Sequence, residues 1–177
     1  MKSILNLATI LVLIFACRIC GTTGSKNGSN PNSSPASVSY AADFIKPQLG
    51  SFKLIKSYTK EEARKTASGF TVKLIEQSND AAGGEYEPSG GRSVALMACN
   101  YTKITVPSSL IDEVEKGLRN DRAWKTVRAI PKPDGKRVEG EDGRGNGLVI
   151  WNNGYWVFMT VGSSLSDASS LADNVGY

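Results

Sequence analysis

Residues 148–161 read LVIWNNGYWVFMTV, with Asn153 and Gly154 in the middle of an otherwise apolar stretch. Both residues tolerate the positive φ of a type I′ turn, so an Asn-Gly pair between two apolar runs predicts a β-hairpin. A turn centred on these two residues pairs Trp151 with Trp156. The stretch therefore predicts two central antiparallel strands whose register is set by the turn.

The predicted hairpin is apolar on both faces. Successive side chains of a strand alternate between its faces. One face then carries Val149, Trp151, Trp156 and Phe158, and the other carries Leu148, Ile150, Val157 and Met159. A domain with helices on one side of its sheet needs only one apolar face, so the second face requires an explanation.

Two interpretations of the tryptophan face are open at this point. The segment around Phe44, Ile45 and Leu49, or the long loops, can cover that face as a second small core. Alternatively, the side chains of Trp151, Trp156 and Phe158 form an exposed aromatic patch that binds a partner protein, a glycan or a lipid headgroup. Large aromatic side chains suit such a patch because they give much contact area and lose little entropy.

The rest of the chain supplies further strands and two helices. Apolar and β-branched patterns predict strands at residues 52–58, 70–75, 93–106 and 124–130. Residues 59–66 are expected to form a charged helical turn or a loop, the glycine-rich stretch that includes Gly83 and Gly84 a turn region, and residues 131–145 a polar excursion.

The first helix is predicted at residues 108–119, opened by Pro107 and capped by a Ser109–Asp112 capping box. The second helix follows Ser164. This order of elements predicts a single α+β domain over residues 41–177, with a mostly antiparallel sheet of about five to six strands and two helices on one face.

The N-terminus carries a different signal. Lys2 precedes an apolar run over residues 4–16, which is the layout of an export signal. The run ends in Ile14-Phe15-Ala16-Cys17, which resembles the lipobox of bacterial lipoproteins. This resemblance implies that residues 1–16 are removed as a signal peptide and that Cys17 carries the lipid anchor. Ordinary secretion, with cleavage near Gly21 or Gly24, and an uncleaved membrane anchor are the alternatives.

Residues 17–40 are rich in Gly, Ser, Asn, Thr and Pro and offer almost nothing to bury, which indicates a flexible tether. A tether of this length has a mean reach of roughly 25 Å. We therefore expect an exported lipoprotein whose tether holds its domain off the surface of a membrane of the bacterial cell envelope.

Composition excludes several function classes. The chain has no histidine, so it cannot use a Ser-His-Asp or Cys-His arrangement or an HExxH metal site. Its net charge of +4 is too small to indicate nucleic-acid binding. We expect Cys99 to be a small buried apolar residue, because no histidine can activate it as a nucleophile.

Residues 139–147, EGEDGRGNG, gather carboxylates and glycines but fit neither a calcium loop nor a phosphate cradle. We expect no metal ion and no cofactor there, and a solvated loop instead. The same stretch supplies the carboxylates for the enzymatic alternative, a small envelope hydrolase or glycan-processing enzyme that uses Glu139, Glu141 and Asp142.

The favoured function is a non-catalytic, lipid-anchored binding or scaffold domain of the cell envelope. Its partners would be the membrane, through the lipid, and an envelope protein or glycan. The hairpin VIWNNGYWVF followed by a short terminal helix also resembles small uncharacterised secreted domains of environmental bacteria. That resemblance assigns no role to any residue.

Overall fold

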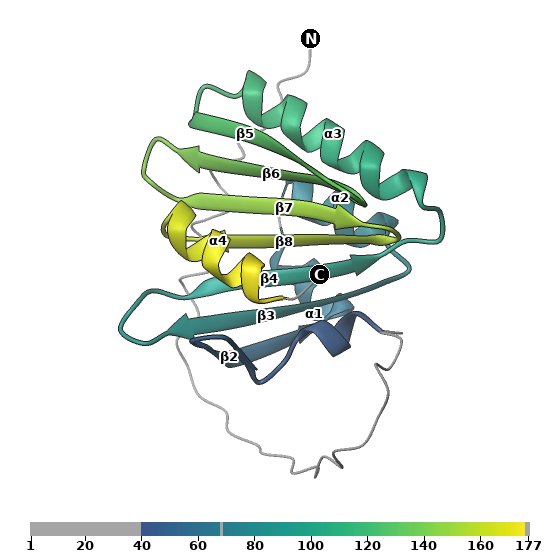
Figure 1. Ribbon diagram of the computed structural model, residues 1–177. Coiled ribbons are helices and arrows are strands. Elements are labelled where there is room, and N and C mark those ends of the chain that lie inside the picture. Colours follow the sequence, from purple (N-terminus) through teal and green to yellow (C-terminus); the bar gives the residue numbers. More distant parts are fainter. Residues whose placement is uncertain (1–39, 68, 176–177) are drawn as a thin grey trace.

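The structure, a computed structural model, describes residues 40–67 and 69–175. These residues form one eight-stranded sheet with helices on both faces, in which every neighbouring pair of strands is antiparallel. The strand order is β1-β2-β3-β4-β8-β7-β6-β5 (Figure 1). The α+β class and the antiparallel sheet are confirmed, but the sheet has eight strands rather than five to six, and there are four α-helices rather than two.

The strands are β1 (Gln48–Leu49), β2 (Phe52–Thr59), β3 (Asp80–Pro88), β4 (Val94–Asn100), β5 (Trp124–Lys132), β6 (Gly135–Asp142), β7 (Gly147–Asn153) and β8 (Trp156–Gly162). The helices are a short 3-10 helix η3 (Ala41–Phe44) and α1 (Lys60–Thr66), α2 (Phe70–Gln77), α3 (Thr105–Asn120) and α4 (Leu165–Asn174).

The helices divide between the two faces of the sheet, so the prediction of helices on one face is wrong. In Figure 1, α4 lies in front of the sheet and α1 and α2 lie behind it. The side chains of α4 join the cluster that contains Trp151 and Phe158, whereas those of α1, α2 and α3 join the cluster that contains Ile150 and Val157. Because both faces of the central hairpin are apolar, each face needs its own cover.

The central hairpin forms with a register that differs from the predicted one. Trp151 pairs with Phe158 and Asn153 with Trp156, so the two-residue turn consists of Gly154 and Tyr155. Gly154 has a φ of 57°, a conformation that glycine adopts at little cost. The residue numbers of two paired residues add up to 307 in the predicted register and to 309 in the observed register. A change of two in this sum keeps every side chain on its face, so the predicted assignment of residues to faces is confirmed.

Residues 70–75 were expected as a strand, but they lie in the helix α2. Their buried residues are Thr71, Leu74 and Ile75, which follow the i, i+3, i+4 spacing of a helix face. A short apolar run fits both periods, and the packing of this run against the sheet decides between them. The charged turn expected at residues 59–66 is the helix α1, whose N-terminus is capped by Thr59 and Glu62.

Two segments that were expected to be irregular are strands. Gly83 and Gly84 lie inside β3, where a Cβ atom on Gly84 would come within 2.9 Å of side-chain atoms of Ile45 and Leu54. Glycine here provides room for close packing rather than a turn. The polar stretch 131–145 contains β6, which forms a hairpin with β5.

The helix ends also differ in part from expectation. α3 begins at Thr105, and the expected capping box is absent, because Ser109 Oγ donates a hydrogen bond back to the Thr105 carbonyl oxygen. Ser164 caps α4 as predicted, accepting a hydrogen bond from the Asp167 backbone N–H at 3.0 Å.

Candidate functional site

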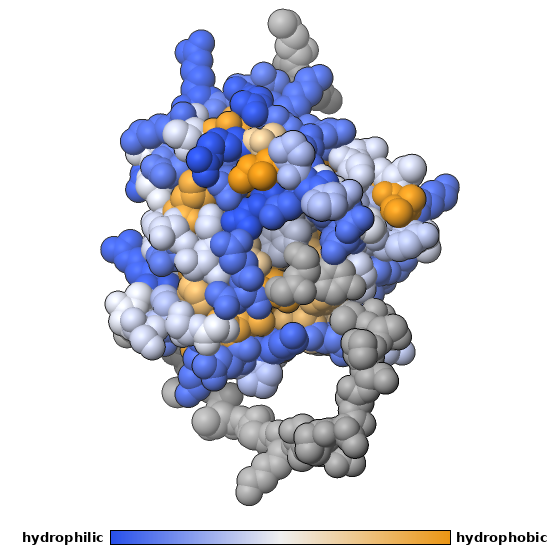
Figure 2. Space-filling view, in the orientation of Figure 1, coloured by the Kyte–Doolittle hydropathy of each residue, from blue (hydrophilic) through white to orange (hydrophobic). Residues whose placement is uncertain are grey.

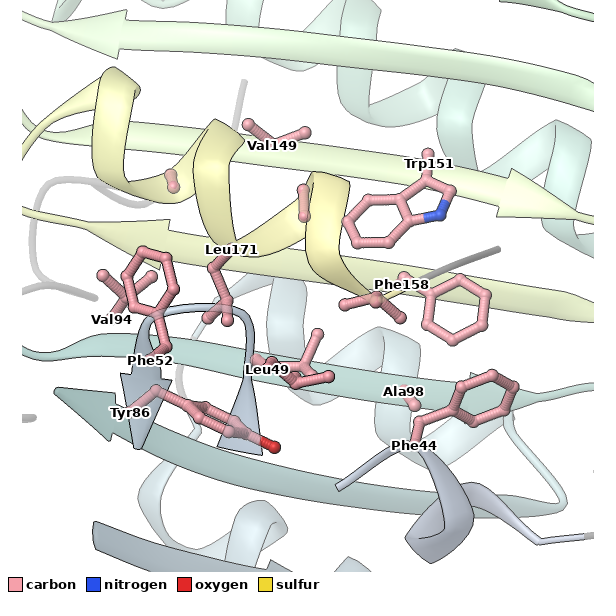
Figure 3. Packing of buried hydrophobic residues seen from close by; sticks show 14 of the residues in the cluster. Phe44, Leu49, Phe52, Tyr86, Val94, Ala98, Val149, Trp151, Phe158 and Leu171 are labelled. Atoms are coloured by element: carbon pink, nitrogen blue, oxygen red, sulfur yellow. The ribbon is translucent and has the colours of Figure 1, made fainter. Parts of the chain in front are cut away.

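The aromatic side chains proposed as a partner-binding patch lie in the core. Trp151, Trp156 and Phe158 are all buried, and none is more than 7 % exposed. The Phe44 ring packs edge-on against them, with its centroid 4.9 Å from that of Trp156 and 4.7 Å from that of Phe158. Figure 3 shows Phe44, Leu49 and Leu171 packed over this face. The N-terminal segment and α4 therefore cover the face, and the side chains of Trp151, Trp156 and Phe158 offer no surface to a partner.

The N-terminal segment is also held by a hydrogen bond from the sheet. The Tyr86 hydroxyl donates to the Lys46 carbonyl oxygen at 3.1 Å. Burial raises the pKa of Tyr86 to about 12, because the phenolate would lose its hydration. This hydroxyl therefore remains a donor at neutral pH, and it stabilises the segment that covers the tryptophans.

A network of charged side chains borders the aromatic core at β6. Arg137 Nε lies 2.9 Å from Glu139 Oε1, and both side chains are at most 10 % exposed. The guanidinium of Arg137 also binds Asp173 of α4, and Arg128 of β5 binds the other oxygen of Glu139 at 2.8 Å. The network thus joins β5, β6 and the C-terminal end of α4.

Sequence reasoning missed the roles of Arg137 and Asp173. The sequence feature that could have revealed them is the spacing of Arg137 and Glu139, which are two positions apart and so share one face of β6. Arg137 lies directly opposite Trp151 of β7. This arrangement places both charges on the tryptophan face, where they can be buried only as a pair.

Two of the three carboxylates proposed for hydrolysis, Glu139 and Asp142, have fixed structural partners. Glu139 is held by two arginines, as described above. Asp142 accepts hydrogen bonds from the Arg144 and Asn146 backbone N–H groups, at 2.8 and 2.9 Å, and from the Asn146 side chain. Glu139 and Asp142 are three positions apart on one strand, so alternation directs them to opposite faces of the sheet. The structure therefore does not bring Glu139 and Asp142 together as an acid–base pair, and Glu141, two positions from Glu139 on β6, is beside a Glu139 carboxylate that two arginines already hold.

Hydrogen bonding also explains why the Asp142 carboxyl group is ionised. Its partial burial would raise the pKa of the carboxyl group, but the hydrogen bonds from Asn146 and Arg144 outweigh this effect and hold the pKa below its usual value. Asp142 is a charged anchor of the loop between β6 and β7.

Cys99 is buried on β4, as expected for a small apolar residue. Its burial raises the pKa of the thiol to about 12, and a hydrogen bond to Tyr101 opposes this only in part. The thiol is therefore neutral at physiological pH, and the thiolate that a nucleophile requires does not form.

A shallow surface depression of about 330 Å³ lies along the exposed side of α3. Its lining consists of Asp112, Glu115, Lys116, Arg119 and Asn120. Lys136 of β6 reaches this helix and binds Asp112 and, at 2.7 Å, Glu115. The hydrogen bonds that Glu115 accepts from Lys136 and Arg119 lower the pKa of its carboxyl group. Lys136 and Arg119 thus neutralise Asp112 and Glu115, and Lys116 alone among the charged lining residues makes no ion pair. One exposed lysine does not point to one kind of ligand.

The described part of the chain contains no helix that is both long and apolar enough to cross a bilayer. Within residues 40–67 and 69–175, no three His, Cys, Asp or Glu side chains are grouped as a metal site requires. Cys17, the predicted lipid anchor, and the tether as far as residue 39 lie outside the described residues.

The fold defines the class of protein as an α+β domain with an eight-stranded antiparallel sheet covered on both faces. No family model matches the chain, and no curated protein matches it either. Among solved structures, the chain is similar to a crystal structure described as a GTP-binding regulator from Thermotoga maritima, with a TM-score of 0.48 and 12% sequence identity. The match covers 76% of this chain and 82% of that one. A similarity at this level says nothing about what this chain binds.

Proposed function

We propose that this protein is a lipid-anchored component of the bacterial cell envelope whose domain is a non-catalytic binding or scaffold module. The observation that carries the proposal is the stretch Ile14-Phe15-Ala16-Cys17, which ends an apolar run and precedes a polar tether. Diacylglycerol on Cys17, with an additional N-acyl chain, would provide more than one lipid chain, as stable membrane attachment requires.

The described domain fits a module of this kind. Both faces of its sheet are closed by its own helices and N-terminal segment, so it is a self-contained folded unit at the end of a tether. Two of the three carboxylates of the hydrolase alternative, Glu139 and Asp142, are engaged in an ion-pair network and a loop, and Cys99 is a neutral buried thiol. These contacts favour recognition over chemistry.

The test compares Cys17→Ser with Cys20→Ser in the full chain expressed in a bacterial host. The two cysteines are three residues apart, so Cys20→Ser is a matched control for the loss of one thiol. We expect the wild type and Cys20→Ser to incorporate labelled palmitate and to sediment with membranes, whereas Cys17→Ser does neither. Mass spectrometry of the mature N-terminus should place the lipid on Cys17. An unmodified N-terminus at another residue would overturn the proposal and support ordinary secretion.

A further inference from the structure

The most exposed large apolar side chains of the described residues concentrate at one end of the sheet. Tyr40 is 67 % exposed, Ile104 55 % and Tyr155 49 %. The remaining large apolar side chain with comparable exposure, Ile55, lies at a bulge within β2. Figure 2 shows a hydrophobic side chain among hydrophilic ones at the right-hand end of the molecule, the end at which β4 leads into α3 in Figure 1.

Backbone contacts bring the loops of this end together. The Tyr101 N–H donates a hydrogen bond to the Tyr155 carbonyl oxygen at 2.9 Å, which joins the loop after β4 to the turn between β7 and β8. Ile104 follows in the same loop, immediately before α3. Ile104 and Tyr155 are therefore exposed on adjacent loops at one end of the sheet.

Tyr40 belongs to the same end. The N–H of the next residue, Ala41, donates to Asp80 Oδ2 at 2.7 Å, and Asp80 at the start of β3 pairs with Asn100 at the end of β4. Strands β3, β4 and β8 are neighbours, and strands in a sheet are about 4.8 Å apart. The three side chains, here named the apolar end (Tyr40, Ile104 and Tyr155), thus lie at the same end of the adjacent strands β3, β4 and β8.

The predicted tether joins the domain at this end. Residues 17–40 lead from the anchoring cysteine into Tyr40, and Tyr40 is itself part of the apolar end. The mean reach of the tether, roughly 25 Å, limits the distance between the apolar end and the anchoring cysteine. The apolar end is therefore the part of the domain that the tether holds nearest to the bilayer.

We propose that the apolar end docks on the membrane that anchors the protein, with Tyr40, Ile104 and Tyr155 in the interfacial region of the bilayer. This inference rests on the proposed lipid anchor. Tyrosine suits the membrane interface because its ring is apolar and its hydroxyl stays hydrated. Docking would fix the orientation of the domain and direct its opposite end, at the turn between β3 and β4, away from the membrane.

The charges at the apolar end support insertion rather than attraction to anionic lipid. The nearby acids are engaged with backbone groups, since Asp43 accepts from the Tyr40 N–H at 3.2 Å and Asp80 from the Ala41 N–H. Two cations offset these two acids: Lys103, next to Ile104, is exposed, and Lys60 Nζ donates to the Ser78 and Asn79 carbonyl oxygens beside Asp80. A nearly balanced set of charges gives little electrostatic attraction, so docking should persist on zwitterionic lipid and depend weakly on salt.

The experiment uses the acylated full chain in vesicles of phosphatidylcholine, part of which is brominated in its acyl chains. An environment-sensitive fluorophore is attached at Thr102→Cys, in the loop of Ile104, or at Ser89→Cys, in the turn at the opposite end; both native residues are exposed. A Cys20→Ser background leaves the labelled residue as the reactive thiol, because Cys99 is buried and Cys17 is acylated. Bromine quenches only fluorophores that lie close to the acyl chains.

We expect quenching at position 102 and none at position 89, at low and at high salt. Equal quenching at the two positions in vesicles that carry the protein would overturn the docking while leaving the lipid anchor intact. Protein that does not float with the vesicles would overturn the anchor and the docking together. Quenching at position 102 only with anionic vesicles would overturn the proposed mode of insertion.

A pair of substitutions tests the side chains themselves. Ile104→Ser removes an apolar side chain from the apolar end, and Ile55→Ser removes one of similar exposure from β2. Ile104 precedes the first turn of α3, a position at which serine is well tolerated, so the fold should be retained. We expect Ile104→Ser to reduce the ratio of docked to undocked protein about tenfold and Ile55→Ser to leave it unchanged. An equal effect of both substitutions would overturn the assignment.

Discussion

Arg137 and Glu139 are charged side chains in a mostly apolar layer, and each is stable there because of the other. If Arg137 is replaced by alanine, the Glu139 carboxylate remains buried with only Arg128 as a partner. We expect Arg137→Ala to lower the free energy of unfolding by about 3–5 kcal/mol, as is typical when one member of a buried ion pair is removed. Urea denaturation followed by circular dichroism measures the effect.

The control is Arg128→Ala, which removes the other partner of the same carboxylate. The Arg128 side chain is 70 % exposed, so its loss should cost no more than about 1 kcal/mol. The double variant Arg137→Met, Glu139→Leu should recover most of the stability, because it leaves no buried charge. Similar losses for Arg137→Ala and Arg128→Ala would show that the pair is effectively solvated.

The contribution of Asp142 to the stability of the fold depends on pH. Because its pKa is lower in the folded state than in the unfolded state, its charge contributes stability at pH values above the unfolded pKa. This contribution declines as the pH falls below about 4 and through the folded pKa. We expect Asp142→Asn to lose about 1 kcal/mol at pH 7, after allowance for solvent screening, and to approach the wild type near pH 2. Thermal unfolding at both pH values tests this; a loss that does not change with pH would show that charge is not the cause.

At the scale of elements, two glycines differ in whether their surroundings leave room for a side chain. A Cβ atom on Gly147 of β7 would lie 2.2 Å from Leu165 Cα and 2.5 Å from the Ser164 carbonyl oxygen, at the start of α4. Because these are backbone atoms, Gly147→Ala must displace the helix. We expect a loss of about 2–4 kcal/mol in the free energy of unfolding, by comparison with other overpacked sites.

Gly117 provides the opposite case within α3. A Cβ atom there would meet no atom within 4 Å, and the residue is exposed. Alanine is favoured over glycine in a helix interior by about 1 kcal/mol, so Gly117→Ala should raise the melting temperature. Chemical denaturation of both variants compares them directly. If Gly147→Ala is as stable as the wild type, α4 does not pack on β7 as closely as described.

The elements also differ in how well the local sequence pattern predicts them. The hairpin of β7 and β8 was predictable because its turn and its apolar alternation lie within fourteen consecutive residues. The helix α2 was not, since residues 70–75 carry apolar side chains at both helical and strand spacing. The strand β6 was hidden because its residues on the tryptophan face include Arg137 and Glu139, whose burial depends on each other and on Asp173.

At the scale of the whole molecule, Phe44 closes the face of the sheet that α4 leaves open. The Phe44 side chain is buried and contacts the rings of Trp156 and Phe158. We expect Phe44→Ala to lower the free energy of unfolding by about 3–5 kcal/mol and to shift tryptophan emission to longer wavelength, because the cavity admits water to Trp156. Fluorescence-detected denaturation reports both effects. The control is Tyr40→Ala in the same segment, where the exposed ring makes little contribution to the core. Unchanged emission from Phe44→Ala would show that other residues cover the tryptophans.

The sequence alone indicated the α+β class, the central hairpin, the residues on each of its faces and the serine cap of α4. These features follow from local preference and from alternation, both of which act over a few residues. The export signal and the lipid on Cys17 likewise come from the sequence alone and stay predictions. The tertiary structure decided the hairpin register, the helical state of residues 70–77, the strand β6 and the division of helices between the faces. It also decided that Trp151 and Trp156 are covered, because that depends on contacts with Phe44 and α4 at distant positions in the chain.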